Sequence, residues 1–179
     1  MESGPTKQIL AYWLCPAEPA RAHFIALIND LAMKFDGPAF EPHVTLYVTD
    51  AANENPGAVL ERALKDYGFA RLSIRGLDYS DEFTKTLFVQ FEPEAEVARL
   101  SSDLRRVSAV QSDYELNPHL SLIYKTMSRE EKRDLAATVD LPLDEVCFDS
   151  VKAAISPANI TSREDVEAWR VVATQQLSE

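Results

Sequence analysis

Two five-residue segments, one in each half of the chain, constrain its structure more than any other feature. Pro42-His43-Val44-Thr45-Leu46 is matched by Pro118-His119-Leu120-Ser121-Leu122, and the two histidines are 76 residues apart. β-branched and apolar residues after each histidine favour an extended strand. Because alternate side chains of a strand share a face, each segment is predicted to present one imidazole and one hydroxyl together, backed by apolar residues in a core.

Periodicity along the rest of the chain predicts an α+β fold. Strands are expected at 9–15, 43–49, 71–79, 86–91, 119–124, 146–155 and 169–175, and helices at 19–35, 55–67, 97–107 and 128–139, with a short helical turn within 156–167. The order of elements before residue 79 recurs after residue 86. This recurrence indicates one domain of two similar lobes, formed by pseudo-repeats at about 9–79 and 86–155, with a closing strand at 169–175.

Composition excludes several classes of function. The chain has 179 residues, which suits one domain, and its 29 acidic against 18 basic residues give a net charge of −11. Such a surface disfavours long nucleic acids and acidic membranes as partners. Only five glycines are present, and they cannot form a glycine-rich phosphate loop. With no signal peptide or membrane helix expected, we predict a cytoplasmic monomer that acts on a small ligand.

The remaining histidine and the cysteines do not suggest a metal or a redox centre. Zinc needs three or four ligands, and neither histidine segment has further His, Cys or carboxylate residues at coordinating spacing. Cys15 and Cys147 are interpreted as small core residues, and His23 as a structural histidine on the flank of the first helix. We therefore expect no metal and no cofactor.

Two imidazole–hydroxyl pairs facing one cleft would suit phosphodiester hydrolysis. Imidazole exchanges a proton near neutral pH, so one histidine can deprotonate water while the other protonates the departing oxygen. Two hydroxyls can donate hydrogen bonds to the oxygens of a pentacovalent phosphorane. His43 and His119 are thus the predicted catalytic residues, and Thr45 and Ser121 the predicted phosphate-binding residues; the near symmetry leaves open which histidine is the base.

The same segments resemble the paired HxT/S motifs of the two-histidine phosphoesterase superfamily, and within it the cyclic nucleotide phosphodiesterase family. Trp13-Leu14-Cys15-Pro16, the run through Phe40-Glu41 into the first motif, Ile123-Tyr124 after the second, and Trp169 support this resemblance. It implies a bilobal α+β fold with antiparallel sheets and outer helices around a central cleft. It also implies metal-independent opening of ADP-ribose 1″,2″-cyclic phosphate and nucleoside 2′,3′-cyclic phosphates, the latter to 2′-phosphates.

Three aromatic residues near the motifs are candidates for substrate binding. Tyr47 shares strand parity with His43 and could contact a base or sugar, or pack at the strand end. Tyr124 resembles the cleft tyrosine of the family, although parity places it opposite His119 unless the strand bulges or ends after Ile123. Trp13 could stack on a base or be buried. Lys125 stands where the family pattern leads us to expect a small residue, which affects the cleft mouth.

Two alternatives remain open at this point. One is RNA-end processing or cleavage of 2′–5′-linked oligonucleotides, against which the acidic composition argues weakly. The other is a nucleotide-binding module without catalysis, against which the intact histidines and hydroxyls argue.

Overall fold

The computed structural model describes residues 6–179, and in this range seven strands and five α-helices alternate along the chain. The strands are β1 (Gln8–Pro16), β2 (Val44–Asp50), β3 (Ala70–Tyr79), β4 (Leu87–Phe91), β5 (His119–Ile123), β6 (Glu145–Pro157) and β7 (Arg170–Gln176). The helices are α1 (Ala20–Phe35), α2 (Pro56–Ala63), α3 (Ala95–Val107), α4 (Arg129–Thr138) and α5 (Arg163–Glu167), with a 3₁₀ turn, η1 (Phe83–Lys85).

The strands form one antiparallel sheet in the order β1-β2-β5-β4-β3-β6-β7, in which β1 also pairs with β6. The predicted α+β class with antiparallel strands is therefore confirmed, and the strands of the two lobes belong to a single curved sheet. The long strand β6 joins them, because its residues 145–148 pair with β3 while 148–157 pair with β1. Only one residue pair, Val44 with Leu120, links β2 to β5.

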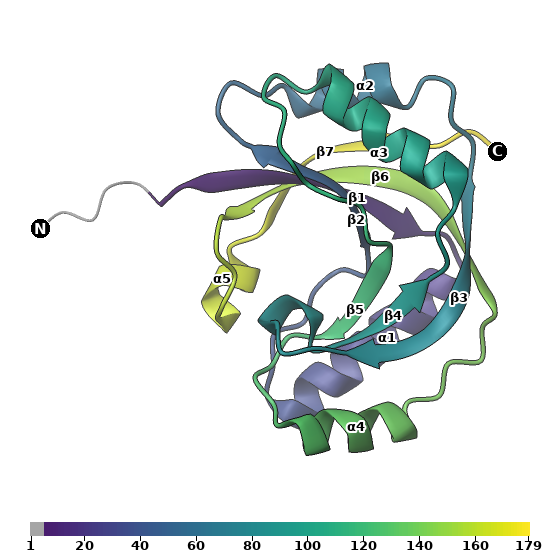
Figure 1. Ribbon diagram of the computed structural model, residues 1–179, viewed down its shortest axis with the longest axis vertical. Coiled ribbons are helices and arrows are strands. Elements are labelled where there is room, and N and C mark those ends of the chain that lie inside the picture. The colour runs from purple at the N-terminus through teal and green to yellow at the C-terminus, as the bar shows by residue number, and fades with distance from the viewer. Residues whose placement is uncertain (1–5) are drawn as a thin grey trace, which may run out of the picture.

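Each lobe combines elements from both halves of the sequence. In Figure 1, β1, β2, β6 and β7 lie beneath α2 and α3, whereas β3, β4 and β5 lie above α1 and α4. Helix α1 thus covers the lobe that contains β5, and α3 covers the lobe that contains β2. The four longer helices, α1 to α4, lie on the outer side of the sheet.

Local sequence signals fix several helix ends. The Asn55 side chain accepts a hydrogen bond from the Ala58 N–H, and Pro56 occupies the first turn of α2. Ser128 and Glu131 form the predicted capping box of α4. Helix α2 ends at Ala63, earlier than predicted, because residues 64–67 form a turn that leads into β3.

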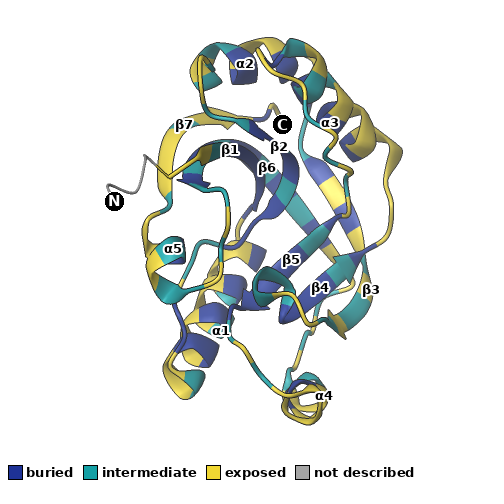
Figure 2. Cartoon of the chain, turned by 60° about the vertical axis from the view of Figure 1, so that its left-hand side comes forward, coloured by how far each residue is buried: buried dark blue, intermediate teal, exposed yellow. Residues whose placement is uncertain are grey.

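The core lies between the sheet and the helices. Figure 2 shows buried residues on the strands and on the inward faces of the helices, whose outward faces are exposed. Phe24 and Ile28 of α1, Leu104 of α3, and Phe148 of β6 are almost completely buried in this core. Within the described part of the chain, no helix is long and apolar enough to cross a membrane.

A β-bulge interrupts each histidine strand at the same place. Tyr12 pairs with Tyr47 and Trp13 with Thr45, which leaves Leu46 without an opposite residue. In the other lobe, Leu87 pairs with Ile123 and Phe88 with Ser121, which leaves Leu122 as the extra residue. A bulge shifts the alternation of side chains. The faces predicted from simple alternation therefore hold as far as Thr45 and Ser121 but not beyond them.

Candidate active site

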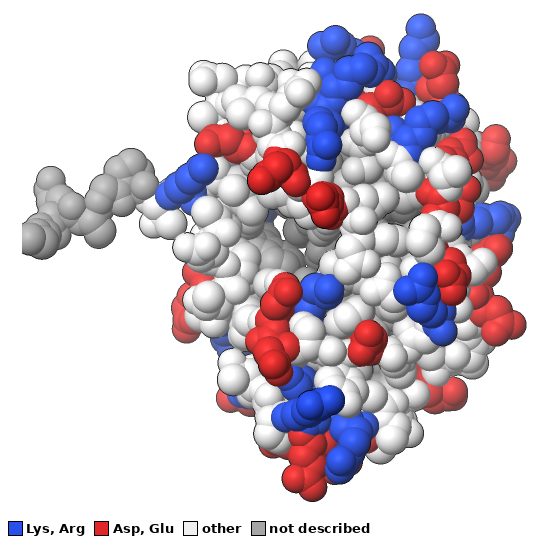
Figure 3. Space-filling model, in the orientation of Figure 1, with Lys and Arg blue, Asp and Glu red and all other residues white. Residues whose placement is uncertain are grey.

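One cavity of about 320 Å³ lies between the lobes and brings the two motifs together. It is lined by Ile9, Ala11, Trp13, His43, Thr45, Val48, Glu82, Thr84, Lys85, Tyr114, Glu115, Asn117, His119, Ser121, Tyr124, Ser156, Ile160 and Trp169. Figure 3 shows a hollow near the centre of one face, with acidic side chains around it. All four residues predicted for catalysis and phosphate binding thus share one cavity.

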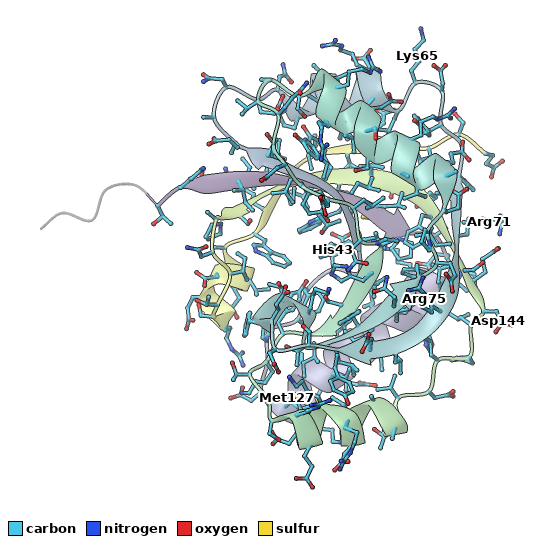
Figure 4. The ribbon with its side chains drawn as sticks, in the orientation of Figure 1. His43, Lys65, Arg71, Arg75, Met127 and Asp144 are labelled. Carbon is cyan, nitrogen blue, oxygen red and sulfur yellow. The ribbon has the colours of Figure 1, made fainter. Side chains whose placement is uncertain are left out.

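The two histidines are held by equivalent hydrogen bonds. His43 Nδ1 lies 2.7 Å from the carbonyl oxygen of Glu41, and His119 Nδ1 lies 2.7 Å from that of Asn117. A carbonyl oxygen only accepts, so each Nδ1 carries the proton and donates it. The neutral ring then has its lone pair on Nε2, which is left for a ligand. Figure 4 places His43 in the central space between the lobes.

Burial favours the neutral form of both imidazoles. Burial, with a smaller contribution from the nearby charge of His119, lowers the pKa of His43 to about 4, although the hydrogen bond to the Glu41 carbonyl acts in the opposite direction. Burial also lowers the pKa of His119, with a smaller contribution from the Lys85 ammonium. Both rings are thus neutral at pH 7 in the ligand-free protein. An anionic ligand between them would favour protonation of one imidazole.

An aromatic ring supports each histidine from the neighbouring strand. Trp13 of β1 stacks on His43 with ring centroids 4.1 Å apart, and Phe88 of β4 meets His119 edge-on at 5.4 Å. Trp13 lines the cavity, as the sequence suggested, but it is buried and one of its faces is covered by His43. Phe88 was not predicted as a site residue, although its position in the strand 86–91 was a usable signal.

The two hydroxyls differ in their hydrogen bonds. Ser121 donates to the Thr84 carbonyl at 2.6 Å, whereas the Thr45 hydroxyl has no hydrogen-bond partner within residues 6–179. Thr45 is therefore ready to bind a ligand oxygen. Ser121 can donate to a ligand only if it releases Thr84.

The two tyrosine predictions have opposite outcomes. Tyr47 is completely buried in the main core, where its hydroxyl accepts a hydrogen bond from the Ser112 N–H, so its placement in the cleft was wrong. The bulge at Leu46 turns Tyr47 inward and places Val48 at the cavity instead. Tyr124 does line the cavity, because the bulge at Leu122 shifts the alternation and β5 then ends at Ile123. Burial raises its pKa well above the ordinary value.

Further aromatic rings close one side of the cavity. Phe40 stacks on Tyr124 with centroids 4.0 Å apart, and Trp169 lies 5.6 Å from Tyr124 and 5.9 Å from His43. The indole N–H of Trp169 is buried and has no hydrogen-bond partner among residues 6–179. This side of the cavity can therefore hold the flat, apolar part of a ligand.

Side chains behind each histidine hold the carbonyl that orients it. Glu41 pairs with Lys152 of β6, and both side chains are largely buried. On the other side, the Asn117 side-chain oxygen accepts a hydrogen bond from the Gln90 amide at 3.0 Å. These long-range contacts were not predicted, because no local pattern connects residues 41 and 152.

The other sequence predictions are placed as follows. Cys15 is buried and Cys147 half-buried. His23 lies on α1, outside the residues that line the cavity. Lys125 bounds an adjacent cavity that shares Tyr124, and its ammonium donates to the Asp36 carbonyl. Within residues 6–179, no three His, Cys, Asp or Glu side chains are grouped so that they could hold a metal ion.

An antiparallel sheet that carries two histidine–hydroxyl segments to one cavity agrees with the predicted resemblance to the two-histidine phosphoesterases. Comparison with protein families identifies the branch. The chain belongs to the family described as cyclic phosphodiesterase-like protein, which matches residues 9–177. A curated relative, the cyclic phosphodiesterase of Arabidopsis thaliana, is 25% identical over 176 residues, which cover 96% of this chain and 97% of the relative.

Solved structures share the fold. Escherichia coli LigT in its apo form has a TM-score of 0.58 at 14% identity, with 99% of this chain and 100% of LigT covered. LigT complexed with 3′-AMP has a TM-score of 0.59 at 14% identity, with 98% and 100% covered. The family match and the curated relative identify this chain as an enzyme of the cyclic phosphodiesterase type, and the solved structures show that it has the fold of LigT.

Proposed function

We propose that this protein hydrolyses small cyclic phosphodiesters, namely ADP-ribose 1″,2″-cyclic phosphate and nucleoside 2′,3′-cyclic phosphates, without a metal ion. The observation that carries the proposal is the pair of Nδ1-anchored histidines on the wall of one cavity. The nucleotide complexes of LigT, with 3′-AMP and with ATP, support a nucleotide as the ligand class. His43, His119, Thr45 and Ser121 carry the reaction.

The proposed reaction is a direct displacement by water. One imidazole takes a proton from water through Nε2, and the water oxygen forms a bond to phosphorus. The bond from phosphorus to one sugar oxygen breaks, and the other imidazole, protonated at both nitrogens, gives that oxygen a proton. The products are the 1″-phosphate of ADP-ribose or a nucleoside 2′-phosphate, with one water consumed.

The hydroxyls and the aromatic rings would bind the substrate. Thr45 donates to an oxygen of the phosphoryl group, whose negative charge grows in the transition state. Ser121 joins it when its hydroxyl turns from Thr84 to the phosphate. Tyr124 and Trp169 pack against the sugar or the base, while Trp13 chiefly supports His43.

Turnover of defined substrates tests this proposal. We expect the purified protein to convert 2′,3′-cyclic AMP and ADP-ribose 1″,2″-cyclic phosphate, with little cleavage of a 2′–5′-linked adenylate trimer, as separated by chromatography. Preference for the trimer would contradict the proposed substrate class. Binding of the cyclic nucleotides without turnover would contradict catalysis and favour a binding module.

A further inference from the structure

The His119 side of the cavity carries an ammonium group that the proposed reaction does not use. Lys85, the last residue of η1, lines the cavity, and its Nζ lies 4.8 Å from the centre of the Phe88 ring. Phe88 in turn contacts His119. No carboxylate within residues 6–179 forms an ion pair with Lys85, and of the described residues that line the cavity it alone is a lysine or arginine.

The backbone that carries Lys85 is firmly held. Each carbonyl of η1 accepts a hydrogen bond from a hydroxyl: Phe83 from Thr86 at 2.9 Å, Thr84 from Ser121 at 2.6 Å, and Lys85 from Ser80 at 2.6 Å. These bonds anchor η1 to the end of β3, the start of β4 and the second motif. The bonds from Ser80 and Thr86 do not involve Ser121, so they still hold η1 when the Ser121 hydroxyl turns to a phosphate. The lysine is therefore presented from a fixed point of the cavity wall.

Lys85 enters the cavity from η1, whereas the reacting phosphate must lie between the two imidazoles, which are carried by other segments of the wall. His43 is buried, and His119 is half-buried like the η1 residues. Glu82 and Glu115 also line the cavity, so the positive charge is confined to one place on a wall that is otherwise neutral or acidic. Such a wall favours a compact anionic group at one point and disfavours an extended polyanion.

We infer that Lys85 binds a second anionic group of the substrate, beyond the phosphate that reacts. The preferred substrates are then nucleotides that carry a phosphate or diphosphate in addition to the cyclic phosphate. The inference rests on the proposed function, since it takes the reacting phosphate to lie between His43 and His119. Lys85 is thus a specificity-determining residue of the same cavity.

Binding of non-reacting ligands tests this inference without turnover. ADP and adenosine share a base and sugar but differ by a diphosphate, and calorimetry gives Kd for each with the wild type, Lys85→Gln, Lys85→Arg and Lys34→Gln. Lys34 is the matched control because it also lies over an aromatic ring, Phe35, but on α1 outside the cavity. We expect Lys85→Gln to weaken ADP binding roughly tenfold, with adenosine unchanged and Lys85→Arg close to the wild type.

Equal weakening of ADP binding in Lys85→Gln and Lys34→Gln would overturn the inference, as would ADP binding no tighter than adenosine in the wild type. Kinetics then separate it from the proposed function. If the wild type hydrolyses both cyclic substrates, Lys85→Gln should raise KM for ADP-ribose 1″,2″-cyclic phosphate and not for 2′,3′-cyclic AMP. If the wild type hydrolyses neither substrate, the proposed function is overturned. The Kd values for ADP would still decide whether Lys85 binds an anionic group.

Discussion

His43 and His119 are held in the same way but lie in different surroundings. A backbone carbonyl two residues earlier accepts the Nδ1 proton of each, which fixes the same tautomer in both rings. His43 is stacked on Trp13 and buried, whereas His119 is half-buried, beside Phe88 and near Lys85. Two rings in this arrangement can serve as an acid and a base in one step.

Replacing either histidine should abolish most of the activity. We expect His43→Gln and His119→Gln each to lower kcat for 2′,3′-cyclic AMP by roughly 10²–10⁴, the usual contribution of a general acid or base. His23→Gln is the matched control, since it removes the third histidine from outside the cavity. Circular dichroism should show that all three variants fold. A fully active variant at position 43 or 119 would contradict the paired mechanism.

At the scale of single elements, the bulged strands decide which side chains reach the cavity. Leu46 and Leu122 are extra residues at equivalent points of β2 and β5, and Val48 reaches the cavity where alternation predicts Tyr47. After the equivalent bulge in β5, Tyr124 reaches the cavity in the same way. A regular strand in either place would present a different set of residues.

Ser121 and Thr45 should differ in what they contribute to stability. Ser121→Ala leaves the Thr84 carbonyl without its hydroxyl donor, and we expect the free energy of unfolding in urea to fall by about 1–2 kcal/mol. Thr45→Val, which removes a hydroxyl with no protein partner in the described range, should lower kcat without that loss. Equal destabilisation by both substitutions would show that the Ser121–Thr84 bond does not anchor η1.

The pair of Lys152 with Glu41 should act on the reaction through His43. Lys152→Met leaves the Glu41 carboxylate without its partner and loosens the carbonyl that orients the imidazole. We expect kcat to fall roughly tenfold with KM nearly unchanged, because small displacements of a catalytic group are costly.

Rescue and a control variant distinguish this positioning from general destabilisation. Lys152→Arg should restore kcat, since it can again pair with Glu41. Arg75→Met, which breaks the exposed pair with Glu92 outside the cavity, should leave kcat unchanged. An unchanged kcat in Lys152→Met would contradict the positioning role.

Sequence patterns predicted the residues whose placement depends on local periodicity. Alternation placed His43 with Thr45 and His119 with Ser121 on one face, and turn and capping signals located α2 and α4. Bulges depend on the neighbouring strand, so the burial of Tyr47 could not be predicted from its own segment. Lys85 and the Glu41–Lys152 pair were missed because η1 has no local signature and residues 41 and 152 meet only in the folded sheet.

At the scale of the whole molecule, the single sheet connects the two lobes around the cavity. Strand β6 pairs with strands of both lobes, and each lobe takes helices from both halves of the chain. The halves can therefore not fold independently into the two lobes. That the halves arose as pseudo-repeats stays a prediction, which the equivalent bulges support.

Burial of a neutral histidine at the centre of this structure should make its stability depend on pH. The pKa of His43 is about 4 in the folded protein and about 6.5 when unfolded, so the unfolded state binds more protons between these values. The stability that depends on His43 being neutral is fully present above pH 6.5 and is lost as the pH falls toward 4. The difference in unfolding free energy between the wild type and His43→Gln should rise over this window by at most about 3 kcal/mol. If the difference in unfolding free energy between the wild type and His43→Gln does not change from pH 4 to 6.5, the burial of a neutral imidazole is contradicted.

We propose that two imidazoles hydrolyse one cyclic phosphate without a metal ion. Phosphorus NMR of 2′,3′-cyclic AMP with the purified protein in excess chelator tests this proposal. We predict that the cyclic phosphate resonance is replaced by a single phosphomonoester resonance, and that His43→Gln and His119→Gln both suppress this conversion. Conversion that appears only after a divalent metal is added, or that persists in either variant, would contradict the proposal.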